Sequence, residues 1–97
     1  MVNRVQRVGV VGAGAMGRGI AQVCASGGLT VKLYDSSQEA VSRGIQAVRD
    51  DLAQAVAKSK MSQADADDSL NRIQAVNDLK ALCDCDLVVE ALSLIHI

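Results

Sequence analysis

The sequence predicts an α/β protein built on a parallel sheet, and three observations favour this fold class. Apolar segments typical of strands alternate with helical patterns along all 97 residues. The first of these segments, Val8–Val11, runs directly into a glycine-rich turn. The segment Asp86–Ala91 is apolar throughout its centre, which is typical of a strand covered on both faces of a sheet.

The turn after the first strand carries three glycines with the spacing G-x-G-x-x-G. Gly12 permits the tight turn, Gly14 lets the backbone approach a pyrophosphate, and Gly17 lets the following helix pack close to the strand. A helix that begins near Ala15 would direct its unpaired N–H groups and the positive end of its dipole at a diphosphate. The pattern predicts a Rossmann-type dinucleotide site. The alternative is a glycine-rich turn that binds nothing.

The residues after this turn predict an amphipathic helix and a second strand. Apolar residues follow Gly17 at helical spacing: Ile20, Ala21, Val23 and Cys24. Gly27-Gly28 predicts the end of the helix, because glycine adopts the left-handed conformation without steric cost. Thr30–Tyr34 reads as the second strand.

Asp35 follows directly at the C-terminal end of the second strand. Its carboxylate is placed to accept hydrogen bonds from the hydroxyls of an adenosine ribose, and it would repel the 2′-phosphate of NADP. No arginine follows in Ser36–Gln38 to neutralise that phosphate, so the sequence predicts NAD as the cofactor. The alternative is an aspartate that caps a turn or helix, for which Ser36 is the better candidate.

The 36 residues of Ser36–Asn71 exceed what one crossover helix needs and predict a helical hairpin inserted before the third strand. Its first helix opens with a capping box, Ser36-x-x-Glu39, and runs to about Lys58. Its apolar stripe consists of Val41, Ile45, Val48, Leu52 and Ala55. The second helix starts from a Ser62 cap and carries acidic residues near its positive end.

Two further strands are predicted, Arg72–Val76 and Asp86–Ala91, joined by a helical turn over Asn77–Cys83. The order of elements is the first half of a doubly wound sheet, with the spatial strand order 3-2-1-4. We find no repeat, low-complexity stretch or linker, so residues 1–97 are interpreted as one incomplete domain.

Composition excludes several function classes. A net charge of −1, a sequence pI near 5.6 and scattered basic residues give no footprint for nucleic acid. One tyrosine, without tryptophan or phenylalanine, provides no platform for stacked bases. No apolar run is long enough to cross a bilayer and the N-terminus lacks a signal-peptide pattern, so we expect no membrane contact.

The three cysteines, Cys24, Cys83 and Cys85, are odd in number and lie in helical or pre-strand contexts. This usage predicts small, buried, reduced thiols and a cytoplasmic protein. A metal site or redox pair at Cys83-x-Cys85 is the alternative. It lacks a second cysteine pair and a nearby histidine, so we expect no metal site.

These residues resemble a known family. Val8–Asp35, with Gly-Ala-Gly-Ala-Met-Gly followed by Gly19–Val23, looks like the NAD-binding N-terminal domain of 3-hydroxyacyl-CoA dehydrogenases. The resemblance continues through Ala57–Ser62, Arg72-Ile73 and Cys85–Ala91, and so covers residues 5 to about 92. Within the family, the alanine- and aspartate-rich second helix of the hairpin is similar to bacterial 3-hydroxybutyryl-CoA and 3-hydroxyadipyl-CoA dehydrogenases.

The resemblance implies that a homodimeric parent enzyme of fatty acid metabolism oxidises (S)-3-hydroxyacyl-CoA to 3-oxoacyl-CoA by hydride transfer to NAD. It implies that Asp35 holds the adenosine ribose and that Lys58 binds the CoA moiety of the acyl-CoA substrate. A solvated lysine near a helix C-terminus is the alternative for Lys58. The residues implied to hold the pyrophosphate are Gly12, Ala13, Gly14, Ala15, Met16 and Gly17.

The end of the chain departs from the family. The family's catalytic histidine and glutamate belong to a later segment, so we expect no catalytic residue here and an inactive fragment. His96 stands in the wrong context to be that base, and Leu94 occupies the position where the family places a second glutamate. We therefore expect residues 93–97 to be a non-native tail on a truncated product.

The sequence leaves two other functions open. A 3-hydroxyacid dehydrogenase of the phosphogluconate-related kind shares a glycine loop ending in Met-Gly, although Tyr34-Asp35 stands where that group usually has Asn-Arg. A nucleotide-sensing module without chemistry would use the same half sheet. It would leave an apolar position exposed beside the fourth strand.

Overall fold

A computed structural model describes residues 5–91 of the chain. The elements expected from the sequence fall inside this range, whereas the predicted non-native tail 93–97, with Leu94 and His96, lies outside the described residues. No helix within the described range is long and apolar enough to cross a membrane.

Four parallel strands form one sheet in the order β3-β2-β1-β4, which confirms the predicted fold class and strand order. The strand bounds are β1 Arg7–Val11, β2 Thr30–Tyr34, β3 Ile73–Val76 and β4 Leu87–Glu90. Because the strands are parallel, the turns that follow β1 and β2 lie together at the carboxyl end of the sheet. This arrangement brings the glycine turn and Asp35 together.

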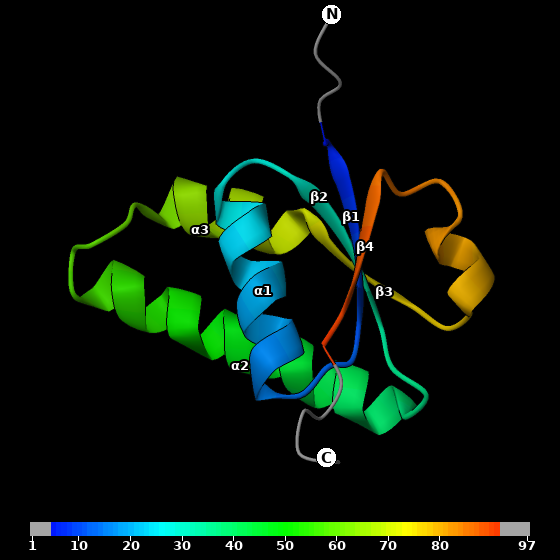
Figure 1. Cartoon of the computed structure of the whole chain (residues 1–97). Coiled ribbons are helices and arrows are strands. Elements are labelled where there is room, and N and C mark those ends of the chain that lie inside the picture. Colours follow the sequence, from blue (N-terminus) through cyan, green and yellow to red (C-terminus); the bar gives the residue numbers. More distant parts are fainter. Residues whose placement is uncertain (1–4, 92–97) are drawn as a thin grey trace, which may run out of the picture.

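Three helices lie on one side of the sheet, and a short 3-10 helix lies on the other (Figure 1). Their bounds are α1 Ala15–Ser26, α2 Gln38–Ala57, α3 Gln63–Asn71 and, for the 3-10 helix, η1 Leu79–Leu82. Helices α2 and α3 confirm the inserted hairpin, and the Ser62 hydroxyl accepts from the Asp65 N–H as the predicted cap of α3 (3.1 Å). Gly28 has a φ of +95°, which confirms the glycine stop after α1.

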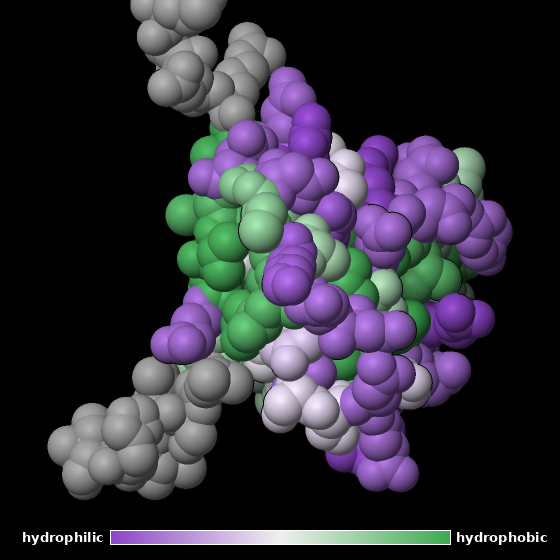
Figure 2. Space-filling model, turned by 90° about the vertical axis from the view of Figure 1, so that its right-hand side faces the viewer, coloured by the Kyte–Doolittle hydropathy of each residue, from purple (hydrophilic) through white to green (hydrophobic). Residues whose placement is uncertain are grey.

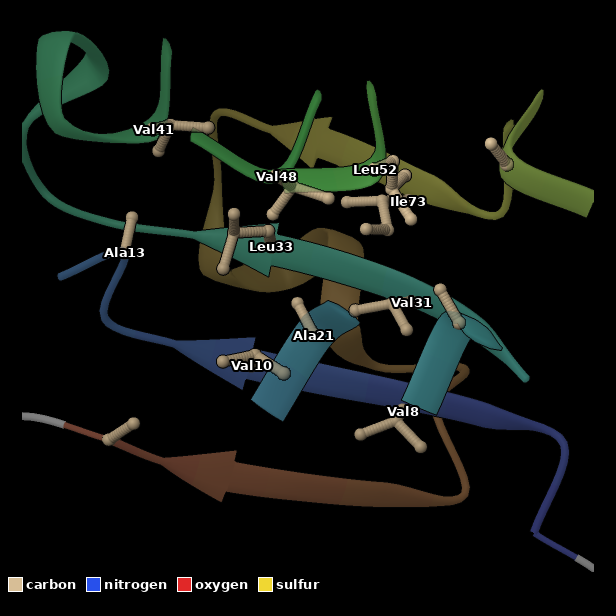
Figure 3. Packing of buried hydrophobic residues seen from close by; sticks show 13 residues of the cluster. Val8, Val10, Ala13, Ala21, Val31, Leu33, Val41, Val48, Leu52 and Ile73 are labelled. Carbon is tan, nitrogen blue, oxygen red and sulfur yellow. The ribbon is translucent and has the colours of Figure 1, made fainter. Parts of the chain in front are cut away.

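The core lies between the sheet and the three helices (Figure 3). β1 and β2 turn their alternate residues toward the helices, and these four are almost fully buried: Val8, Val10, Val31 and Leu33. The predicted stripe of α2 is confirmed, because Val41, Val48 and Leu52 are buried against them and Ile45 is partly buried. The core side chains are small and aliphatic throughout, which suits a thin layer between helix and sheet.

The apolar face expected for α1 is wrong in one respect. Val23 is 73% exposed, whereas Ala21 and Ala25 are fully buried. The helix is buried along the line of Gly17, Ala21 and Ala25, which are four residues apart. Since only small residues occupy this line, α1 packs close to the sheet and the larger Val23 points away from it.

The predicted capping box at Ser36 is also wrong, because Ser37 is the N-cap of α2. The Ser37 hydroxyl accepts from the Ala40 N–H (3.1 Å). The Asp35 side chain accepts from the Ser37 N–H (2.8 Å) and so closes a turn over Asp35–Ser37. Because of this turn, the helix starts one residue later than the sequence pattern indicates. Glu39 pairs with Arg43 on the helix surface (2.9 Å) instead of reaching back to the cap.

β4 is not covered on both faces as expected. It forms the edge of the sheet, and Leu87 and Val88 are each 49% exposed. Figure 2 shows hydrophobic surface gathered on one side of the molecule, while most of the rest of that view is hydrophilic. The exposed apolar surface expected at the fourth strand is therefore present, and Leu87 and Val88 contribute to it.

Candidate functional site

The glycine turn leaves β1 through a left-handed residue. Gly12 has a φ of +108°, a conformation that costs other residues steric strain, and its N–H donates to the Tyr34 carbonyl (2.7 Å). The sheet ladder thus continues one residue past β1 before the chain turns into α1. This geometry confirms the tight turn predicted for Gly12.

Gly17 and Gly14 are required for different reasons. A Cβ at Gly17 would lie 1.6 Å from the Gly12 carbonyl oxygen, so the close packing of helix and turn excludes any side chain there. A Cβ at Gly14 would meet no atom within 4 Å, and Gly14 has an ordinary extended conformation. The protein itself therefore does not need a glycine at this position. Its bare backbone faces open space.

The N-terminus of α1 borders that open space. Gly14 is its N-cap and offers no side chain to the first N–H groups, and the first turn carries no acidic residue. The first N–H groups of a helix lack partners within it, and the positive end of the helix dipole adds to their attraction for an anion. Ala15 and Met16 are exposed here, with Met16 at 50%.

Asp35 is tied to the glycine turn by its side chain. Its Oδ2 accepts from the Ala13 N–H (2.9 Å) and its Oδ1 from the Ser37 N–H (2.8 Å). The hydrogen bond from Ser37 has the largest effect, and together with that from Ala13 it lowers the pKa of the Asp35 carboxyl below its ordinary value. Burial acts in the opposite direction and is outweighed. The turn-capping role weighed as an alternative is thus present. Each carboxylate oxygen still has a second acceptor site for a hydroxyl group.

Lys58 lies apart from this site. It follows α2 as its C-cap, whereas Asp35 precedes the other end of that 20-residue helix, about 30 Å along its axis. Lys58 lines an open groove of about 270 Å³ between α1 and α2. The other residues lining this groove are Gln22, Asp51, Gln54, Ala55 and Lys60.

Sequence reasoning missed two residues near these places. Lys60 lines the same groove as Lys58, beyond Ser59, whose φ of +58° turns the chain. Gly44 is buried in α2 against the glycine turn. The signal for Gly44 was available, because a glycine interrupts the apolar stripe between Val41 and Val48.

The cysteines are free thiols, but they are not all buried as expected. Cys24 and Cys85 are half-buried, whereas Cys83 is exposed just after η1. Burial raises the pKa of the Cys85 thiol, with the Asp84 carboxylate adding to the shift. Within residues 5–91, no three His, Cys, Asp or Glu side chains are grouped so that they could hold a metal ion.

The geometry at the carboxyl end of the sheet combines a bare glycine backbone, an uncapped helix N-terminus and a carboxylate one strand away. A family model described as "3-hydroxyacyl-CoA dehydrogenase, NAD binding domain" matches residues 7–93. The chain belongs to this family. The resemblance read from the sequence is confirmed, and NAD is the cofactor that the family's domain implies.

Individual relatives agree with this assignment. The chain is 43% identical over 93 residues to the 3-hydroxyadipyl-CoA dehydrogenase of Escherichia coli strain K12, covering 96% of this chain and 20% of that protein. It is 41% identical over 86 residues to the 3-hydroxybutyryl-CoA dehydrogenase of Bradyrhizobium diazoefficiens, covering 89% of this chain and 29% of the relative.

A crystal structure of 3-hydroxybutyryl-CoA dehydrogenase from Escherichia coli K12 superposes with a TM-score of 0.92 at 42% identity. The match covers 95% of this chain and 20% of the other. The 97-residue chain thus spans 20% to 29% of the length of these three relatives. It corresponds to their N-terminal, NAD-binding part.

Proposed function

We propose that the glycine turn and Asp35 bind NAD. The pyrophosphate would lie on the backbone of Gly12–Gly17, at the N-terminus of α1, and the adenosine ribose would lie on the Asp35 carboxylate. The observation that carries this proposal is the open face at Gly14, where the bare backbone leaves room for a ligand beside the N-terminus of α1. The residues present therefore fit the cofactor implied by the family.

The charges around Asp35 support NAD over NADP. The lowered pKa keeps Asp35 ionised at neutral pH, so its carboxylate would repel a 2′-phosphate. The residues directly after it, Ser36–Gln38, supply no cation. The nearest cation on α2 is Arg43, which lies eight residues after Asp35 in the chain and pairs with Glu39 on the helix surface (2.9 Å).

For the whole protein we propose the oxidation of (S)-3-hydroxyacyl-CoA to 3-oxoacyl-CoA, with NAD accepting the hydride, in a homodimeric enzyme of fatty acid metabolism. The names of the relatives support this substrate class. The described residues include no histidine that could serve as a general base, so the chain alone is expected to bind cofactor without turnover. A cytoplasmic location stays a prediction from cysteine usage.

Lys58 is proposed to contact the CoA moiety of that substrate. The groove it lines holds a second cation, Lys60, two amides, Gln22 and Gln54, and one carboxylate, Asp51. Two cations against one anion leave the groove net positive, which suits a phosphate-bearing ligand. Lys58→Ala is expected to weaken CoA binding to the chain about fivefold, the loss of one charge-assisted contact. Lys80→Ala, on η1 across the sheet, is the matched control and is expected to bind CoA as the wild type does. Equal CoA affinity of Lys58→Ala and the wild type would refute the contact.

The NAD site is tested most simply at Gly14. Gly14→Ala adds a methyl group that meets no protein atom within 4 Å, so the melting temperature should stay close to that of the wild type. The same methyl group fills the space proposed for the pyrophosphate, so NADH affinity, followed by nucleotide fluorescence, should fall at least about tenfold. A Gly14→Ala chain that binds NADH as tightly as the wild type would sink the proposal.

A further inference from the structure

Gly44 is an anomaly in helix α2. It lies on the buried face, between Val41 and Val48, where the helix otherwise presents apolar side chains to the core. A glycine inside a helix costs about 1 kcal/mol relative to alanine. The structure offers a specific reason for its presence.

The reason is a direct contact between α2 and the glycine turn. A Cβ at Gly44 would lie 3.0 Å from the Ala13 carbonyl oxygen and 3.5 Å from the Ala13 Cβ. A separation of 3.0 Å is tighter than nine in ten real Cβ contacts, so a side chain would displace the turn or the helix by a few tenths of an ångström. In Figure 3 the Ala13 side chain points toward the layer formed by α2.

The backbone of Ala13 is consequently held both at its N–H group and at its carbonyl group. Its N–H donates to Asp35 Oδ2 (2.9 Å), and its carbonyl oxygen faces Gly44. Its side chain is only 3% exposed. These contacts come from the end of β2 and from α2, two elements outside the turn itself.

The orientation of the Ala13 carbonyl determines where the next N–H points. The Ala13 carbonyl and the Gly14 N–H belong to one planar trans peptide group, so they point in opposite directions. Because the carbonyl is directed at α2, the Gly14 N–H is directed away from α2. Gly14 is also the residue whose Cβ position opens onto free space.

We propose that Gly44 is a positioning residue for the diphosphate: by bringing the α2 backbone against the Ala13 carbonyl, it sets the direction of the Gly14 N–H. This inference rests on the proposed binding of NAD at the glycine turn. It adds a residue in the hairpin helix, remote in sequence from the glycine motif, to those that determine affinity for the cofactor.

The test compares the wild-type chain with Gly44→Ala and with Gly19→Ala, using ADP and adenosine as probes in amide NMR spectra. Gly44→Ala should shift the ligand-free Ala13 and Gly14 resonances, leave those of α3 in place, and weaken ADP about tenfold. Adenosine affinity should stay unchanged, because the ribose contact at Asp35 does not involve the Gly14 N–H. Gly19→Ala is the matched helical control, since its added methyl group meets no atom within 4 Å.

The outcomes separate this inference from the proposed function. A wild-type chain whose turn resonances do not respond to ADP would refute the NAD site itself. A wild type that binds ADP, together with a Gly44→Ala chain of equal ADP affinity and unmoved Gly14 resonance, would overturn only the role of Gly44. A Gly44→Ala chain that fails to fold, or that loses adenosine and ADP affinity equally, would also overturn it, because either result indicates a general structural role.

Discussion

Asp35 and Asp86 stand at opposite ends of one sheet and make closely similar hydrogen bonds. Asp35, after β2, accepts from two backbone N–H groups at 2.9 and 2.8 Å. Asp86, before β4, accepts from two backbone N–H groups at 2.8 and 3.0 Å, those of Gln6 and Arg7 at the start of β1. In each case these donors lower the pKa of the carboxyl below its ordinary value.

The surroundings of the two carboxylates differ. Asp35 lies beside a bare backbone at Gly14 and the uncapped N-terminus of α1. Asp86 lies beside a set of ion pairs, in which Asp84 contacts Arg7 (3.4 Å) and Lys32 (2.8 Å). A carboxylate that accepts backbone hydrogen bonds is thus present at both ends of the sheet. The groups beside it make the difference: open backbone beside Asp35 suits a ligand, whereas ion pairs beside Asp86 indicate a structural contact.

The largest expected effect is at the carboxyl end, for Gly17→Ala. Its Cβ would lie 1.6 Å from the Gly12 carbonyl oxygen, so the turn or α1 must move, at a cost of about 1–3 kcal/mol or more in the free energy of unfolding. Thermal melting should show this loss, and NADH fluorescence titration should show no saturable binding.

The matched control is Gly27→Ala at the other end of α1, where the added Cβ would have ordinary contacts of 3.5 Å. It should bind NADH as the wild type does. Wild-type NADH affinity in Gly17→Ala would contradict the importance of the close packing at the turn.

Next in size is the effect of Asp35→Asn on cofactor selectivity. Removing the negative charge weakens the contact with the ribose hydroxyls and abolishes the repulsion of the 2′-phosphate. The ratio of NADH to NADPH affinity, measured by isothermal titration, should fall about tenfold or more. Asp86→Asn is the matched control, and a similar fall in its ratio would erase the proposed difference between the two carboxylates.

Acid stability should be affected at both ends alike. Each carboxyl has a folded-state pKa below the ordinary value of 3.8, so its stabilising contribution is complete above that value and is lost as the pH falls through the lower, folded pKa. The wild type should therefore lose stability below about pH 4. The free energy of unfolding, measured with urea at decreasing pH, should fall less steeply in Asp35→Asn and in Asp86→Asn than in the wild type. A fall as steep as that of the wild type would count against the hydrogen bonds assigned to these carboxylates.

The smallest expected effect is at the amino end, for Lys32→Met. The Lys32 ammonium donates to Asp84 (2.8 Å) and to the Ala81 carbonyl (2.9 Å), and methionine keeps the apolar stem while removing both contacts. The melting temperature should fall by no more than about 5 °C. NADH affinity should stay at the wild-type value, and a clear decrease would show that the amino end contributes to the site.

Local patterns predicted the elements of the fold and the tight turn after β1. The glycine spacing, the Gly27-Gly28 stop and the Ser62 cap each act within a few residues, so their consequences are readable from the sequence. The strand order follows from parallel topology once the elements are identified.

The errors arose where a residue's role depends on a partner distant in space or on competing local hydrogen bonds. Ser37 rather than Ser36 caps α2, because the Asp35 side chain takes up the intervening turn. Val23 is exposed because the distance between α1 and the sheet admits only alanine and glycine on the buried line. A glycine in the apolar stripe marks Gly44 as unusual in the sequence, but its contact at Ala13 joins segments far apart in the chain, so the sequence does not show what it packs against.

The central claim is that the carboxyl end of the sheet, with its glycine turn and Asp35, is a site for NAD. Titration of the 97-residue chain with NADH and with NADPH tests it most directly. The account predicts saturable NADH binding that is at least about tenfold tighter than NADPH binding. Equal affinity for the two nucleotides, or no NADH binding by a folded chain, would contradict it.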